Sequence, residues 1–434
     1  MVTRKEKREL EKDTNYFFEF VKIKEHFCRN LDRKLKRVKD PRHQSYVTYG
    51  TDLLLLMIIV KNASNCKSMR EMSHRLNRDE CIENIKKVLR LESLDELPNY
   101  DTINDFLMKV SPEELEHIRT YIIQELLKKR SLERYRIKGG YWGVIVDGTG
   151  LFSFKEEHCD HCLRRVYTDE ETGDKQTVYM HHVLEAKLVV GDMVLSIGSE
   201  FIENESKDVS KQDCELKAFY RLVEKLKETF KRLPICILGD SLYACEGVFH
   251  LCEQYRWKYI LRFKEGRIQS LGDEFQAQKK LEQSTMKNVF WANDLAYQAR
   301  TVNMLEGTVE EQEKQKQFLF LTNIRVNERN AKALVSAGRH RWHIENQGFN
   351  HQKNHRYHIE HANSHDYQAM KNHYLLTQIT DILMQLYEKG LDVLKRIRKS
   401  KKEISSNLLE AIRTRLLTDE DISHLKKPIQ VRLT

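Results

Sequence analysis

The chain has 434 residues, of which 40% are hydrophobic and 32% are charged, and its formal net charge is +9 at pH 7. This length is enough for two or three domains with cores of their own, and no low-complexity segment argues against a chain that is folded throughout. The basic balance permits binding to nucleic acid without requiring it, because basic stretches such as 128–138 and 395–402 are commonly solvated helix faces.

Three features predict a cytoplasmic protein. The first residues, MVTRKEKREL, lack the apolar segment of a secretory signal. The longest apolar run, Leu53–Val60, is far shorter than the roughly 20 residues that span a bilayer, so it predicts a buried helix. The nine cysteines are scattered and odd in number, which favours reduced thiols over a disulfide framework.

The first part of the chain, residues 1–138, predicts a helical N-terminal domain. Ser111 followed by Pro112 and two glutamates is a typical helix start, with serine as N-cap and proline in the first position. Gly139 and Gly140 then end the helical pattern.

Residues 139–270 predict alternating strands and helices. Short apolar runs bounded by turn residues predict strands, and apolar residues at a 3.6-residue period predict an amphipathic helix. The predicted strands are 142–148, 181–190, 193–198, 235–238 and 257–263, with a two-residue hairpin turn at Gly191-Asp192 and helices at 211–230 and 243–255.

The strand at 142–148 is predicted to end on Asp147, and the strand at 235–238 runs into Gly239 and Asp240. The helix at 211–230 is a crossover, so these two strands can lie parallel and adjacent. Ligands of open α/β sheets bind at the carboxyl ends of such strands. We therefore expect Asp147 and Asp240 to lie side by side, although Asp240 could instead only cap the helix that follows it.

The remainder of the chain divides into three predicted parts. Residues 271–325 predict a β-rich insertion, with strands at 289–298 and 318–324 and an acidic stretch, 306–313, between them. Residues 326–390 predict a return to helix, and residues 391–434 form a basic C-terminal tail.

A helix through RWHIENQGFNHQK places four residues on one face if each residue turns by about 100°. These residues are Arg341, Glu345, Gly348 and Gln352. The face would then combine a guanidinium, a carboxylate, an amide and a glycine that leaves room for a ligand. The simpler interpretation is a surface Arg-Glu pair worth a few tenths of a kcal/mol.

Taken together, Asp147, Asp240 and Glu345 suggest a metal site. Three carboxylates can hold two divalent cations about 4 Å apart, of which one activates a water or a 3′-hydroxyl and the other stabilises the leaving oxygen of a phosphodiester. Carboxylate oxygens suit hard cations such as Mg²⁺. Such chemistry requires no serine, cysteine or tyrosine nucleophile.

The pieces VIVDGTG, ILGDSLYA and RWHIENQGFN, in this order and with the β-rich insertion before the last, resemble the DDE transposases of bacterial insertion sequences, specifically the insertion-sequence-four type. The resemblance extends from about Trp142 to Tyr387. It implies an α/β fold with a ribonuclease-H-like core, a mixed sheet with flanking helices, interrupted by the insertion. It also implies catalysis by Asp147, Asp240 and Glu345 with two Mg²⁺ (or Mn²⁺) ions.

The resemblance further implies DNA as the partner, both as terminal inverted repeats and as target, and a homodimer that joins two element ends. The helical N-terminal domain would bind the ends. The family's helix motif is Tyr, two residues, Arg, three residues, Glu, six residues, Lys. Arg341 and Glu345 match it, but Gly338 stands at the Tyr position and Gln352 at the Lys position, followed by Lys353. We expect Arg341, Gln352 and Lys353 to contact DNA.

Two alternative functions stand beside this interpretation. A transposase-derived protein could bind specific DNA without cutting it, as the missing Tyr and Lys suggest, although the three acids argue against this. A ribonuclease-H-like nuclease could cut DNA without strand transfer.

Two further motifs carry alternatives of their own. Cys159 and Cys162 have the spacing of half a zinc site, which His181, His182 or Cys214 could complete after folding, although free loop cysteines are the simpler interpretation. Trp342 could stack on a displaced base, but packing in the core is the favoured prediction.

Overall fold

The computed structural model describes residues 3–264, 266–281, 286, 288–311, 314–425, 427 and 429–433. These residues form two compact units. Unit 1 combines residues 1–130 with 350–434, and unit 2 consists of residues 131–349. No helix in the described part of the chain is long and apolar enough to cross a membrane. All nine cysteines are free thiols.

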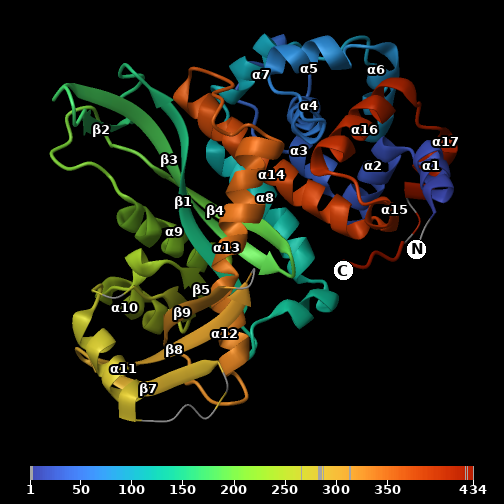
Figure 1. Ribbon diagram of the computed structural model, residues 1–434. Helices are drawn as coiled ribbons and strands as arrows, with labels where there is room; N and C mark the ends of the chain where they lie inside the picture. The colour runs from blue at the N-terminus through green and yellow to red at the C-terminus, as the bar shows by residue number, and fades with distance from the viewer. Residues whose placement is uncertain are drawn as a thin grey trace. The chain divides into compact units, whose positions relative to one another are not determined.

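Unit 1 is helical (Figure 1), and its core includes helices that are buried on every side. In α4 every residue is buried, as predicted for the run Leu53–Val60, because a helix that is apolar all round belongs in a core. The described helices are α1 (Arg4–Asp13), α2 (Tyr16–Phe27), α3 (Leu31–Lys36), η1 (Gln44–Tyr46), α4 (Thr51–Ala63), α5 (Met69–Leu76), α6 (Asp79–Leu89), α7 (Tyr100–Leu107), α8 (Pro112–Leu127), η5 (His351–His355), α14 (Tyr367–Gly390), α15 (Asp392–Ile397), α16 (Lys401–Thr414) and α17 (Asp419–Leu425).

The last part of the chain is folded into unit 1. Helix α14 packs against α2, α4, α7 and α8, and α16 packs against α2 and α6. The stretch predicted as a basic tail, 391–434, therefore contributes three helices to this unit. Helix α8 begins at Pro112 as predicted, with Ser111 as N-cap, but the Ser111 hydroxyl donates to the Glu113 carboxylate instead of accepting from the backbone.

Unit 2 contains one mixed sheet of nine described strands. Along the sheet the order is β2-β3-β1-β5-β6-β9-β8-β7, and β4 also pairs with β3. The strands are β1 (Trp142–Phe154), β2 (Leu163–Thr168), β3 (Lys175–Val190), β4 (Met193–Ile202), β5 (Ile235–Gly239), β6 (Lys258–Arg262), β7 (Val289–Tyr297), β8 (Arg300–Glu311) and β9 (Lys314–Thr322).

The core of this sheet matches the predicted ribonuclease-H-like α/β fold. Strands β4, β3 and β1 are antiparallel, whereas β5 and β6 continue parallel to β1. The predicted hairpin turn lies at Gly191 and Asp192, where the φ of Gly191 is 61° and favours glycine. The helices of unit 2 are η2 (Arg130–Tyr135), which begins at the boundary with unit 1, α9 (Glu215–Thr229), η3 (Ser241–Tyr243), α10 (Glu246–Gln254), α11 (Gln269–Leu281), α12 (Ala331–Arg339), α13 (Arg341–His343) and η4 (Ile344–Phe349).

The predicted β-rich insertion extends the same sheet instead of forming a separate one. Helix α11 opens it, and β9 then pairs with β6 in antiparallel fashion. The acidic stretch 306–313 was expected between strands, but 306–311 lie within β8, while 312 and 313 lie outside the described residues. The two ends of the sheet, β2 and β7, lie at opposite ends of unit 2 (Figure 1).

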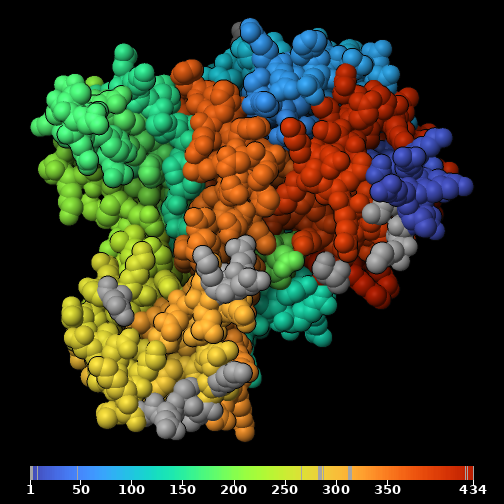
Figure 2. Space-filling model, viewed as in Figure 1, coloured from blue at the N-terminus to red at the C-terminus, as the bar shows by residue number. Residues whose placement is uncertain are grey.

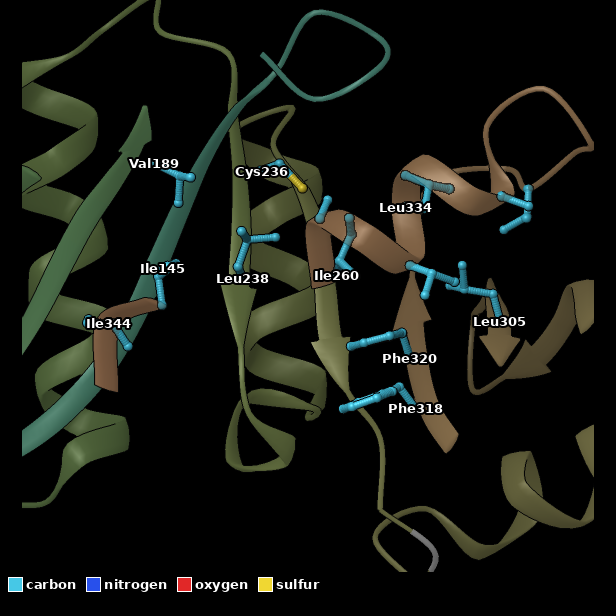
Figure 3. Close-up of a cluster of buried hydrophobic side chains, with 14 of the residues drawn as sticks. Ile145, Val189, Cys236, Leu238, Ile260, Leu305, Phe318, Phe320, Leu334 and Ile344 are labelled. Atoms are coloured by element: carbon cyan, nitrogen blue, oxygen red, sulfur yellow. The ribbon is translucent and has the colours of Figure 1, made fainter. Parts of the chain in front are cut away.

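A buried apolar cluster joins the central strands to the helices that follow β9. It includes Ile145 from β1, Leu238 from β5, Phe320 from β9 and Ile344 from η4 (Figure 3). Because burying each such side chain contributes about 1.5–3 kcal/mol, this cluster fixes the strands beside one another and fixes the segment that carries residue 345.

Candidate active site

Asp147 and Asp240 lie beside each other where β1 and β5 stop pairing. The parallel register ends with Ile145 opposite Leu238, so each aspartate stands two residues beyond the last pair. Asp240 directly follows β5, as predicted. Strand β1, however, continues along β3 to Phe154, so Asp147 lies within a strand and not at its end.

Asp240 also caps the short helix that follows it. Its Oδ1 accepts a hydrogen bond of 2.7 Å from the Leu242 N–H. Capping thus occupies one carboxylate oxygen, and Oδ2 makes no hydrogen bond with another described residue. The capping role and a ligand role are therefore compatible in the same side chain.

A third acid in this cluster, Glu215, was missed in the sequence. The Tyr243 hydroxyl donates a 2.6 Å hydrogen bond to Glu215 Oε1. A β-carbon on Gly148 would lie 2.6 Å from Glu215 Oε2, so glycine next to Asp147 leaves room for this carboxylate. Glu215 lies in the first turn of α9, where acidic residues are common because the helix dipole stabilises them. No sequence pattern therefore distinguished Glu215 as a site residue.

The carboxylates perturb one another. The pKa of Asp147 is raised to about 7, mainly by burial, which Arg341 opposes and the nearby charges of Glu215 and Asp240 reinforce. Arg341 Nη1 lies 3.4 Å from Asp147 Oδ2. Burial and the charge of Asp240 also raise the pKa of Glu215. Perturbed acids of this kind are typical of functional sites.

The raised pKa of Asp147 predicts how the stability of the metal-free protein depends on pH. The folded state holds this proton more tightly than the unfolded state, so the free energy of unfolding should fall as pH rises from about 4 through 7. Asp147→Asn should remove this fall and raise stability at pH 8 by up to about 4 kcal/mol. Denaturant unfolding with EDTA at pH 5 and pH 8 measures this, and a variant less stable than the parent at pH 8 would contradict it.

Glu345 lies on η4, which packs against β1 and β4. The residue before it, Ile344, is buried in the cluster that contains Ile145 (Figure 3). The Glu345 side chain itself is exposed and makes no hydrogen bond or ion pair with another described residue. Glu345 therefore lies on a segment that contacts β1, but its carboxylate makes no contact with the carboxylates of Asp147 and Asp240.

Arginine side chains border the acids. Burial and the charge of Arg341 lower the pKa of Arg262, the last residue of β6, so these two guanidinium groups are neighbours. Arg341 also lies over the ring of Trp342, 5.8 Å from its centroid. Trp342 is 48% exposed, so the prediction that it packs in the core is wrong.

The predicted helix face of Arg341, Glu345, Gly348 and Gln352 does not exist. Segments η4 and η5 are π-helices, whose i→i+5 hydrogen bonds turn the chain less per residue than an α-helix does. Gly348 is buried, and a β-carbon there would lie 3.6 Å from Lys187 Nζ, so the protein's own lysine fills the space expected for a ligand.

Gln352 and Lys353 belong to unit 1. Gln352 is fully buried, and its amide nitrogen donates to Gln378 at 3.0 Å and to Asp381 at 2.9 Å. The DNA contact predicted for Gln352 would require its amide to leave these internal hydrogen bonds. Lys353 Nζ forms an ion pair of 2.8 Å with Glu360.

Gly338, which stands where the family has tyrosine, is tightly packed. A β-carbon there would lie 2.6 Å from Phe320 Cε1, and Phe320 is buried. We predict that Gly338→Ala lowers the free energy of unfolding by about 1–3 kcal/mol, the usual cost of overpacking. Gly272→Ala is the matched control, because its β-carbon would meet nothing closer than 3.7 Å. Denaturant unfolding of both variants compares them, and equal stabilities would contradict the prediction.

Cys159 and Cys162 come together with His181. The two sulfur atoms are 3.7 Å apart, and His181 Nε2 lies 3.5 Å from Cys159 Sγ and 3.4 Å from Cys162 Sγ. These three residues form a group of the kind that can hold a metal ion. Among the described residues, it is the one set of at least three His, Cys, Asp or Glu side chains whose ligand atoms all lie within 4.8 Å of one another. The acids around Asp147 are more widely spaced.

Two family models match the chain. Residues 33–121 match a model described as DDE_Tnp_1-associated, and residues 206–380 match a model described as Transposase DDE domain. The second match includes Asp240, Arg341 and Glu345, and the two together cover more than half of the chain. Among curated proteins, none matches. The chain belongs to the DDE transposase family.

Proposed function

We propose that this transposase is of the insertion-sequence-four type, hydrolyses phosphodiesters at the ends of its element and transfers the resulting 3′-hydroxyl ends to target DNA. The observation that carries the proposal is the placement of Asp147 and Asp240 two residues beyond the last pair of two parallel strands. This edge is where α/β sheets bind ligands.

The residues at this edge fit divalent cations. Asp147, Asp240 and Glu215 supply carboxylate oxygens, the donors that Mg²⁺ and Mn²⁺ prefer. Burial and mutual repulsion raise the pKa of Asp147, and a cation would relieve that repulsion. Asp147, Asp240 and Glu345 would hold two such ions, which when bound supply an activated water or 3′-hydroxyl and stabilise the leaving oxygen.

Arg341 has the chemistry of a phosphate contact. Its guanidinium borders the acids, and a planar fork of N–H donors suits phosphate oxygens. When DNA is bound, Arg341 would exchange its 3.4 Å contact with Asp147 for a phosphate and leave Asp147 free to bind metal. Arg262 would add a second positive charge beside the phosphate.

Two variants can show whether Glu345 or Glu215 is the third metal-binding carboxylate beside Asp147 and Asp240. We expect Glu345→Gln to lose cleavage by about two to three orders of magnitude, the effect of several kcal/mol of lost transition-state stabilisation. Glu215→Gln keeps an acceptor for the Tyr243 hydroxyl, so it should cleave at within about tenfold of the parent rate. Initial cleavage rates at saturating Mg²⁺ measure both, and the opposite ranking would assign the third metal ligand to Glu215.

The helices of unit 1 that match the associated family model would bind the terminal inverted repeats. Lysine and arginine contacts to phosphates would make the affinity fall with salt. Joining two ends would require at least a homodimer, and we propose that it works in the cytoplasm on nucleoid DNA.

The direct test supplies a labelled duplex carrying the element's own end, Mg²⁺ and a target plasmid. Cleavage at the end followed by labelled plasmid supports transposition. Cleavage without joined product favours a nuclease without strand transfer. Binding of the end without any cleavage favours the non-cutting DNA-binding protein, for which Gly338 in place of tyrosine is the motivating observation.

A further inference from the structure

The loop between β1 and β2 crosses β3 beside His181. Strand β1 pairs with β3 as far as Phe154, and β2 pairs with the outer part of β3 from Leu163 onward. The connecting residues 155–162 carry Cys159 and Cys162, and His181 faces them from β3 opposite Phe152. The outer strand β2 and the turn that follows it are exposed at the surface (Figure 2).

The three ligand atoms have the spacing of a tetrahedral zinc site. With Zn–S near 2.3 Å and Zn–N near 2.0–2.1 Å, a tetrahedron separates two sulfurs by about 3.8 Å and sulfur from nitrogen by about 3.6 Å. The observed separations are 3.7 Å between the sulfurs and 3.5 and 3.4 Å from each sulfur to Nε2. A disulfide is a different geometry, because bonded sulfurs lie about 2.05 Å apart.

The surroundings hold this arrangement from several sides. The Cys162 N–H donates to the Cys159 carbonyl at 3.2 Å, which forms the turn within the Cys-x-x-Cys segment. The Asn204 amide nitrogen donates to the Cys162 carbonyl at 2.8 Å, and Asn204 is itself buried. Cys162 and His181 are 3% and 1% exposed, so two of the three ligands are shielded from water.

The structure distinguishes between the partners that the sequence left open. His182 is the neighbour of His181 on β3, so its side chain points to the opposite face of the sheet. Cys214 is exposed at the start of α9 and does not belong to the group. His181 is therefore the partner of the two cysteines.

We propose that Cys159, Cys162 and His181 supply three of the four ligands of one tetrahedral zinc ion. Two thiolates and an imidazole favour zinc over Mg²⁺ or Ca²⁺, which prefer oxygen ligands. The ion ties the 155–162 loop to β3 next to Tyr179 and Met180, which pair with β1 on one edge of β3 and with β2 on the other. The ion has a structural role, because it holds the outer strands β2 and β3. This proposal does not depend on the function proposed for Asp147, Asp240 and Glu345.

The first test measures metal in the full-length protein, purified with a reductant and without chelator. We expect about one zinc per chain by mass spectrometry. Cys162→Ser and His181→Ala should each reduce this severalfold, whereas Cys214→Ser, an exposed cysteine outside the group, should retain it. Absence of zinc from parent protein equilibrated with zinc, or full zinc in Cys162→Ser, would overturn the proposal.

Two further measurements do not rely on variants that could misfold. Replacement of zinc by Co²⁺ in the parent protein should produce sulfur-to-cobalt charge-transfer absorption, and its absence would overturn cysteine ligation. Chelation should also accelerate trypsin cleavage at Arg164 and Arg165 in β2 severalfold, since the loop that leads into β2 loses its tie to β3. Unchanged cleavage would refute the structural role.

Discussion

Asp240→Asn should abolish DNA cleavage while leaving the fold and DNA binding nearly unchanged. The substitution keeps an oxygen that can accept the 2.7 Å hydrogen bond from the Leu242 N–H, so the cap of the following helix survives. It removes the negative charge beside Asp147 that would hold a cation. Losing about 4 kcal/mol of transition-state stabilisation lowers the rate roughly a thousandfold.

The measurement compares initial cleavage rates of the end duplex in Mg²⁺, together with duplex affinity and denaturant unfolding. Asp208→Asn serves as the matched control, because Asp208 is exposed in the loop before α9 and its loss of charge should leave cleavage unchanged. A variant that cleaves as fast as the parent would show that Asp240 only caps η3.

Arg356→Met should destabilise the protein more than any surface substitution. Arg356 is 3% exposed, its guanidinium lies 2.6 Å from Glu388 Oε1, and its Nη2 also donates to the Lys401 carbonyl at 2.8 Å. Removing the arginine leaves the Glu388 carboxylate buried without its counter-charge. Breaking a buried pair in this way costs about 3–5 kcal/mol.

Denaturant unfolding measures the effect, and Arg75→Met is the matched control. Arg75 pairs with Glu71 on an exposed helix face and is 49% exposed, so its loss should cost less than about 0.5 kcal/mol. The double substitution Arg356→Met with Glu388→Met should recover much of the stability, because no isolated charge then stays buried. Equal stability of Arg356→Met and Arg75→Met would contradict the prediction.

The segment from Arg341 to His355 differs from the helix predicted for it. The α-helical wheel assumed one continuous helix, whereas π-helical geometry changes which side chains share a face. The buried Gln352 amide donates hydrogen bonds to Gln378 and Asp381, both in α14. These partners are distant in sequence, so no local pattern could have indicated them.

The sequence by itself determined the α/β core and the pair Asp147 and Asp240. Apolar runs mark buried strands, and a crossover helix between them allows parallel neighbours, so residues just beyond the paired stretch of each strand are expected side by side. It also marked Cys159 and Cys162, because the spacing of a metal-binding pair is local. Only the tertiary structure brought Glu215 to the aspartates and His181 to the cysteines. These contacts depend on packing between elements remote in the chain, which periodicity and spacing do not encode.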